Sequence, residues 1–159
     1  MAIVEMEEIE LNENTQRVPI FNGYLSEIQP LLTVGWGQTE TGDIVDDIRG
    51  TIVYTGNQTL CQSSWPDFKD NNSQLVCTAA LLNPHHGVCF GDSGSGSFVN
   101  QDGVLMVVGP TASMSDPKGI FCIYDEGTTW YTRASYHLDA ISQITGLSKE
   151  YLTGLSNEI

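Results

Sequence analysis

The part of this sequence best suited to chemistry is residues 89–96, Cys-Phe-Gly-Asp-Ser-Gly-Ser-Gly. A serine nucleophile needs an exposed hydroxyl on a tight turn, and glycines on both sides of Ser93 allow such a bend. The same turn would leave backbone N–H groups free to bind the oxyanion of a tetrahedral intermediate. This pattern indicates acyl transfer by a serine. Taken alone, residues 91–94 fit a Gly- and Ser-rich surface loop equally well.

A serine hydroxyl is a weak nucleophile without a general base, and a histidine oriented by a carboxylate usually supplies one. The chain has three histidines, His85, His86 and His137. The first two lie in a loop before the Ser93 turn, and the third lies in a predicted terminal helix. We therefore expect surface or packing roles for all three.

No metal or cofactor is expected. The sequence has no Cys-x-x-Cys pair, and His85 and His86 are adjacent rather than three to five residues apart, so zinc ligands would have to come from unrelated loops. Disulfide bonds are the alternative use of the cysteines. The four cysteines allow three complete pairings, and their number alone chooses none of them.

The composition excludes several partners. The 159 residues include 6 basic and 20 acidic side chains, a net charge of −14. Nucleic acids and anionic membranes require basic surfaces, and no apolar run reaches the ~18 residues of a spanning helix. The even cysteine count and the sequons at Asn57 and Asn71 suit an oxidising compartment. We expect a secreted protein whose signal peptide is not in this chain, because acidic residues stand among residues 1–8.

Short apolar runs separated by turn residues predict an antiparallel barrel or sandwich. The expected strands are residues 17–20, 31–37, 48–54, 75–79 and 103–109, and a further strand opens the acidic segment 1–16. Leu138, Ile141 and Ile144 have helical spacing before Gly146, and Ser135 is a candidate N-cap. A second short helical stretch is expected at residues 148–155.

In this order, the segments resemble the trypsin/chymotrypsin family of serine endopeptidases. Residues 32–37 are similar to its Gly-Trp-Gly strand, residues 48–61 to the strand before its intermediate helix, and residues 130–133 to its last strand. The resemblance implies an all-β fold, the second antiparallel β-barrel of the two-barrel architecture with a C-terminal helix. Residues 1–146 would form a partial protease domain and residues 147–159 a C-terminal tail.

The resemblance also implies a role for each residue of the turn. Ser93 would attack the scissile carbonyl, and the backbone N–H groups of Gly91 and Ser93 would form the oxyanion hole. Asp92 would be the carboxylate that pairs with a new N-terminus after zymogen cleavage. Residues 94–96 depart from the family's Gly-Gly-Pro.

Gly87, Gly109 and Thr111 would belong to the specificity pocket. Gly87 stands where trypsin-like members carry an acid, which argues against cleavage after Arg or Lys. Residues 109–111, Gly-Pro-Thr, replace the family's Ser-Trp-Gly, and Thr111 would narrow the pocket mouth. This favours small or medium apolar substrate side chains, or no productive pocket at all.

The family register implies two disulfides, Cys61 with Cys77 and Cys89 with Cys122. A third family bridge is missing here, since both of its positions, around Leu32 and Val99, are apolar.

No segment resembles the family's Ala-Ala-His-Cys motif, and residues 2–6 are similar to the strand that follows the triad aspartate. We therefore expect a serine endopeptidase chain, acting on protein or peptide substrates, that is inactive unless an N-terminal half supplies His and Asp. A non-catalytic homologue that serves as a binding module is the alternative. An acidic secreted structural protein with an accidental Gly-Asp-Ser-Gly is a third, which the ordered landmarks disfavour.

Overall fold

The computed structural model describes residues 1–39, 41–119, 122 and 125–156. Within these, the strands are β1 (Pro30–Gly35), β2 (Arg49–Tyr54), β3 (Leu75–Ala79), β4 (Gly96–Gln101), β5 (Val104–Ser115) and β6 (Thr128–Thr132). The helices are α1 (Gln58–Gln62), α2 (Leu138–Thr145) and α3 (Lys149–Leu152), with 3-10 turns η1 (Ala80–Leu82) and η2 (Ala134–His137).

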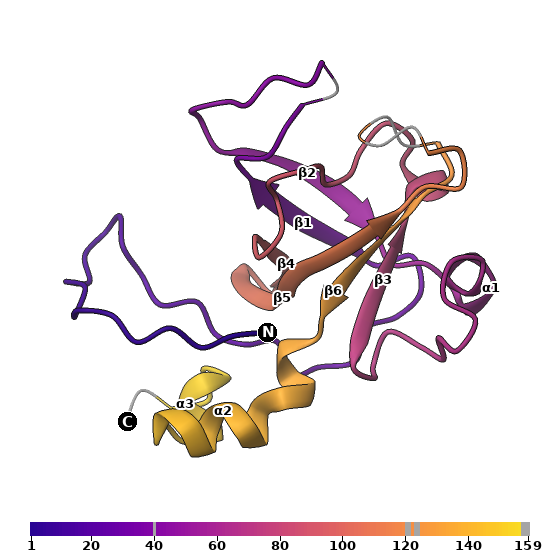
Figure 1. Cartoon of the computed structure of the whole chain (residues 1–159). Coiled ribbons are helices and arrows are strands. Elements are labelled where there is room, and N and C mark those ends of the chain that lie inside the picture. Colours follow the sequence, from indigo (N-terminus) through magenta and orange to yellow (C-terminus); the bar gives the residue numbers. More distant parts are fainter. Residues whose placement is uncertain (40, 120–121, 123–124, 157–159) are drawn as a thin grey trace.

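The strands form one antiparallel sheet in the order β2-β1-β4-β5-β6-β3. The sheet curls so far that its two edge strands approach each other (Figure 1). A single antiparallel bridge between Thr55 and Thr78 joins the chain just after β2 to β3. Register shifts next to Ser97 in β4 and Thr111 in β5 strengthen the local twist. The predicted all-β fold with a C-terminal helix is confirmed.

An apolar core fills the curled sheet. Its buried members come from all six strands, from the segment before β1 and from the loop between η1 and β4, and they are Phe21, Leu25, Leu31, Val53, Val76, Val88, Val99, Val108 and Tyr131. Leu31 and Val99 are 1% and 3% exposed and belong to this same cluster. Leu32 instead pairs with Phe98 across the strands. Of the two predicted bridge positions, around Leu32 and Val99, Val99 thus belongs to the core, whereas on β1 the core residue is the neighbouring Leu31.

A smaller core holds α1 against the sheet. The disulfide between Cys61 and Cys77 ties α1 to β3, and Phe68 and Trp130 pack against it. The rings of Phe68 and Trp130 meet edge to face with centroids 5.3 Å apart. This cluster fixes a five-residue helix that could not persist alone in water.

Most predicted elements occur close to their predicted positions. Strand β3 has the predicted bounds, β1 and β2 overlap their predicted ranges, and β5 extends six residues further than expected. The predicted strand over residues 17–20 is wrong. Only Ile20 pairs there, in a parallel bridge with Val107, and Pro19 has no N–H to give to a ladder.

The expected strand in residues 1–16 is also wrong. Apart from a local bridge between Asn12 and Thr15, no pairing is described there, and Ile3, Val4, Met6, Ile9 and Leu11 are exposed. A strand needs a neighbour to pair with its N–H and C=O groups, and no described strand pairs with this segment.

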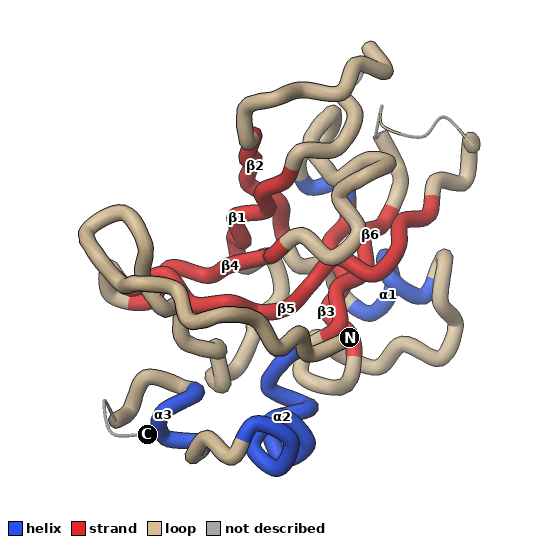
Figure 2. The backbone as a smooth tube through the Cα atoms, turned by 60° about the vertical axis from the view of Figure 1, so that its left-hand side comes forward, coloured by secondary structure: helices blue, strands red, loops and turns tan. Residues whose placement is uncertain are grey.

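Helices α2 and α3 lie together at one end of the sheet, apart from α1 (Figure 2). Leu138 and Ile141 of α2 are buried, while Ile144 is 69% exposed. Gly146 ends the helix with φ 74°. The predicted N-cap is wrong, because Ser135 lies inside η2 and α2 begins after His137, whose side chain makes no capping bond.

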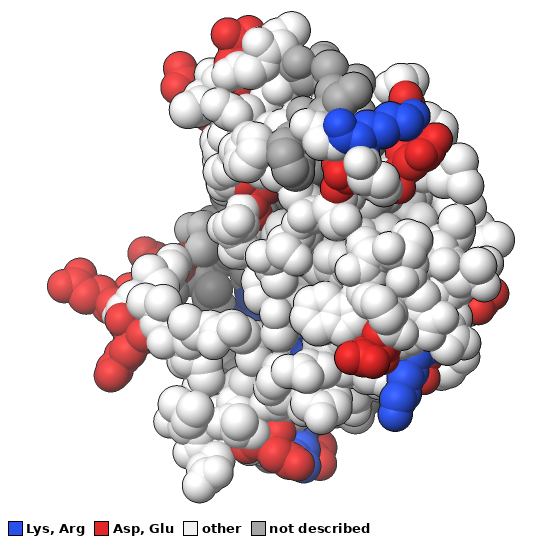
Figure 3. Space-filling view, turned by 45° about the vertical axis from the view of Figure 1, so that its right-hand side comes forward, with Lys and Arg blue, Asp and Glu red and all other residues white. Residues whose placement is uncertain are grey.

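Two of the lysine side chains lie beside acidic ones. Lys118 pairs with Asp125 and Glu126, and Lys149 pairs with Asp139. On the face in Figure 3 the acidic groups form small separate clusters on a largely uncharged surface. Among the described residues, no helix is long and apolar enough to cross a membrane.

One buried cation, Arg133, joins three segments of the chain. Arg133 is 5% exposed and donates from Nη1 to the carbonyl oxygen of Asn71 at 2.7 Å and from Nη2 to that of Gly23 at 2.6 Å. Its Nε donates to Ser135 Oγ at 2.9 Å, and Nη1 also reaches Asn72 Oδ1 at 3.3 Å. The planar guanidinium thus holds the segment before β1 and the loop before β3 against the end of β6.

We expect Arg133→Lys to lower the free energy of unfolding by about 3 kcal/mol, because an ammonium keeps the charge but cannot reach carbonyls on two different segments. Urea denaturation measures the change. The exposed Arg49, changed to Lys, is the matched control and should leave the midpoint nearly unchanged. Equal midpoints for both variants would contradict a pinning role for Arg133.

Candidate active site

Ser93 is exposed on a tight turn between the loop after η1 and strand β4. Gly91 and Gly94 flank this turn with φ values of 96° and 87°, which side chains with a Cβ rarely adopt. The turn is closed by bonds from the Asp92 N–H to the Cys89 carbonyl and from the Ser95 N–H to the Asp92 carbonyl. The sequence therefore places its candidate nucleophile outside the core, with its backbone strongly bent.

The carboxylate of Asp92 holds the turn to its surroundings. Its Oδ1 accepts the N–H of Gly37 at 2.8 Å, and its Oδ2 accepts the N–H of Cys89 at 2.8 Å. Asp92 is half-buried, and these two bonds supply each oxygen with a donor. The chain just after β1 is thereby linked to the start of the Ser93 turn.

Two glycines make this arrangement sterically feasible. A Cβ at Gly35 would lie 1.9 Å from Asp92 Oδ1, and a Cβ at Gly37 would lie 2.5 Å from Asp92 Cγ. Trp36 between them is 55% exposed, so its own side chain does not create the constraint. The two glycines of the Gly-Trp-Gly motif thus leave the space that the Asp92 carboxylate occupies.

Strand β5 supports the other side of the turn. The Gly94 N–H donates to the Thr111 carbonyl at 2.9 Å, and the Thr111 N–H donates to the Ser95 carbonyl at 2.8 Å. In the described part of the chain, the N–H groups of Gly91 and Ser93 make no intramolecular hydrogen bond. These are the two donors that the family resemblance assigns to an oxyanion.

The second disulfide joins Cys89, at the start of the turn, to Cys122. With Cys61–Cys77, it gives the pairing that the family resemblance implies. Among the described residues, no group of three His, Cys, Asp or Glu side chains is arranged to hold a metal ion.

A cavity of about 510 Å³ opens beside Asp92. It is lined by the end of β1, residues 37–39, the start of β2 and residues 85–89, together with Asp92 and Cys122. Gly87 lines this cavity, but Gly109, Thr111 and Ser93 do not. Gly87 and Asp92 thus line one cavity, and the other two predicted pocket residues lie outside its lining.

Gly109 and Thr111 lie inside β5. A Cβ at Gly109 would meet the carbonyl oxygen of Thr132 at 1.8 Å, so close backbone packing requires glycine there. Thr111 is 6% exposed, and its Oγ1 is buried without a hydrogen-bond partner in the described residues.

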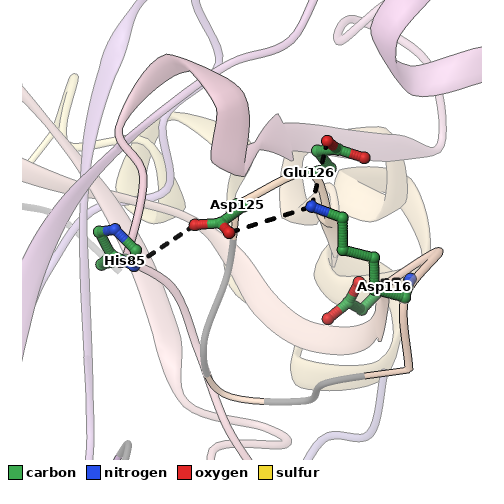
Figure 4. Close-up of polar contacts among 5 residues, drawn as sticks. His85, Asp116, Asp125 and Glu126 are labelled. Carbon is green, nitrogen blue, oxygen red and sulfur yellow. Dashed lines mark hydrogen bonds and ion pairs between the residues drawn. The ribbon is translucent and has the colours of Figure 1, made fainter.

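The three histidines are engaged away from Ser93. His85 Nδ1 lies 3.4 Å from Asp125 Oδ1 in an exposed contact, which Figure 4 shows. His86 Nδ1 lies 2.6 Å from the Thr51 hydroxyl. The Nε2 atom of His137 is buried without a partner in the described residues. None of the three makes a hydrogen bond to Ser93 within the part of the chain that the structure describes.

One buried polar residue near this region was not predicted. Tyr131 of β6 is fully buried, and its hydroxyl makes no hydrogen bond within the described residues. Burial raises its pKa to about 12, and the nearby hydroxyls of Thr33 and Thr78 offset part of the rise. The sequence signal for Tyr131 was its place in a strand whose residues are mostly buried, and that signal indicates packing rather than chemistry.

Comparisons with known proteins give one family. The family described as Trypsin matches residues 1–130. No curated protein matches the sequence. Among solved structures, neuropsin, a serine protease expressed in the limbic system of mouse brain, superposes with a TM-score of 0.68 at 21% identity. The match covers 86% of this chain and 56% of that one, so this chain spans just over half the length of that protease.

We expect Gly35→Ala to destabilise the protein by about 2 kcal/mol, because the new methyl group would displace the Asp92 carboxylate. Chemical denaturation measures the cost in two backgrounds, the natural chain and Asp92→Ala. In the second background the cost should fall by at least half, since the obstructing carboxylate is gone. Gly50→Ala, whose nearest contact would be Val34 Cγ1 at 3.1 Å, is the control on the next strand. Strictly additive costs would contradict the steric coupling.

A second expectation concerns Tyr131 in alkaline solution. Its pKa of about 12 in the folded state exceeds the value of about 10 in an unfolded chain. The contribution of the neutral Tyr131 hydroxyl to the free energy of unfolding is therefore complete below about pH 10, and it is lost as the pH rises from about 10 to about 12. Tyr131→Phe should reduce this alkaline loss by about 2 to 3 kcal/mol. Unfolding free energies at neutral and alkaline pH measure the difference, and parallel pH profiles would contradict it.

Proposed function

Because the chain belongs to the trypsin family of serine proteases, we propose that it supplies the nucleophile half of a serine endopeptidase active site. Its substrates would be peptide bonds in proteins or peptides. Two disulfides and two sequons favour a secreted protein.

The observation that carries the proposal is the Ser93 turn. An exposed hydroxyl stands between two glycines of positive φ, with the free N–H groups of Gly91 and Ser93 beside it. Ser93 Oγ attacks the carbonyl carbon of the scissile bond, and the two N–H groups bind the oxygen as it gains negative charge. Each such donor lowers the barrier by roughly 3 kcal/mol. The tetrahedral intermediate then collapses to an acyl-enzyme and releases the amine.

Asp92 determines whether the two donors are presented together. We assign it the family's activation role, in which an ammonium group binds the carboxylate. Its two oxygens already accept the N–H groups of Gly37 and Cys89, and the adjacent cavity leaves space for a cation. An ammonium there would add a charge-assisted bond to a half-buried carboxylate.

Gly87 supports a substrate preference. It offers no carboxylate to an Arg or Lys side chain, which argues against cleavage after these residues. Gly109 and Thr111 would shape the pocket through the backbone of β5, which is hydrogen-bonded to the Ser93 turn. Small or medium apolar substrate side chains fit this proposal.

The general base has to come from elsewhere. His85, His86 and His137 have other surroundings, so a second polypeptide segment would provide the histidine and its aspartate. Without them, Ser93 keeps its proton at neutral pH and turnover is absent.

We expect a fluorophosphonate probe to label the chain slowly on its own and at least about tenfold faster when imidazole supplies the missing base. Labelling is followed by intact-mass spectrometry. Ser93→Ala should abolish it, whereas Ser95→Ala, in the same turn, should retain it.

Two results would overturn the endopeptidase proposal. If folded protein gives no Ser93-dependent labelling with imidazole, the chain is a protease-like binding module. If Ser93→Ala and Ser95→Ala label equally, the probe reacts elsewhere and Ser93 is not activated by its turn.

A further inference from the structure

The two Asn-x-Ser/Thr sequons have opposite surroundings in the fold. Asn71, in the sequence Asn-Asn-Ser, is 4% exposed. Its Nδ2 donates to the Gly56 carbonyl at 2.9 Å, and its Oδ1 accepts the Cys77 N–H at 2.8 Å. Its own carbonyl accepts Arg133 Nη1 at 2.7 Å. A sugar on Nδ2 would break the bond to Gly56 and find no room, so this sequon is closed in the folded protein.

Asn57, in the sequence Asn-Gln-Thr, uses only one of its two amide atoms. It is the N-cap of α1, and its Oδ1 accepts the Leu60 N–H at 2.9 Å. Its Nδ2 makes no hydrogen bond in the described chain and is not among the buried polar atoms that lack a partner, so it is at least partly accessible to solvent. Gln58 and Thr59, which complete the sequon, are exposed.

The cap and a glycan are compatible. N-glycosylation replaces one hydrogen of Nδ2 and leaves Oδ1 free to accept a hydrogen bond. The bond to Leu60 therefore survives the modification. Helix α1 lies at the periphery of the molecule, beyond β3 (Figure 1), and the Cys61–Cys77 disulfide holds it in place.

We propose that Asn57 is an N-glycosylation site and that Asn71 is not. The donor is an oligosaccharide linked to a lipid pyrophosphate. A bond forms between Nδ2 and the first sugar carbon, the bond from that carbon to the pyrophosphate oxygen breaks, and the lipid pyrophosphate leaves as Nδ2 loses one proton. The proposal depends on the export proposed above and is independent of catalysis by Ser93.

The test expresses the full chain behind a secretory signal in a eukaryotic cell, so that entry into the secretory pathway is supplied. Occupancy is measured by peptide mass spectrometry, before and after removal of N-glycans, on molecules that contain both disulfides. We expect one glycan, at Asn57. Thr59→Ala removes that sequon without touching the cap and should abolish the glycan-dependent mobility shift.

Ser73→Ala is the matched variant, since it removes the second sequon and leaves the amide of Asn71 in place. It should keep the full mobility shift. Ser93→Ala should carry the same glycan, which separates this proposal from the endopeptidase proposal. A glycan on Asn71 in disulfide-bonded molecules, or an unmodified Asn57 in exported protein, would overturn the inference.

Discussion

The contact between the Asp92 carboxylate and the backbone around Trp36 determines the geometry of the candidate site. One carboxylate oxygen accepts from Gly37 and the other from Cys89, so a single side chain fixes two loops that the sheet ladder does not join. With Asp92 anchored, the next residue, Ser93, is exposed to solvent on the bend between Gly91 and Gly94. An unpaired, half-buried carboxylate would cost free energy, which makes these two N–H donors part of the site.

The curled sheet brings the partners of Asp92 together. Strand β1 ends at Gly35, next to the carboxylate, and β4 begins at Gly96, just after the turn. Both strands belong to one continuous ladder with β5, whose Thr111 exchanges backbone hydrogen bonds with the turn. Leu31 and Val99 contribute apolar packing to this part of the core in place of a covalent bridge.

Local pattern and family register account for different parts of the structure. The β-branched run of β3 located that strand, and the spacing of Leu138, Ile141 and Ile144 located α2, although only Leu138 and Ile141 of these three are buried. Pattern failed at residues 17–20 and 1–16, where strand formation depends on a partner that no local signal reveals. The disulfide pairing followed from the register alone. Neither source showed that Gly35 and Gly37 leave room for Asp92. Gly37 and Asp92 are 55 residues apart in the sequence, so no local pattern joins them.

This dependence on backbone groups predicts which positions can vary. Trp36 is the largest residue of its motif, yet most of it is exposed, and neither of the hydrogen bonds to Asp92 involves it. The glycines beside it carry no side chain, and any Cβ there would strike the carboxylate. Substitutions at Trp36 should therefore be tolerated far better than those at Gly35 or Gly37. The shape of the site therefore depends on the lack of a Cβ at two glycines and on backbone N–H groups, which every residue except proline possesses.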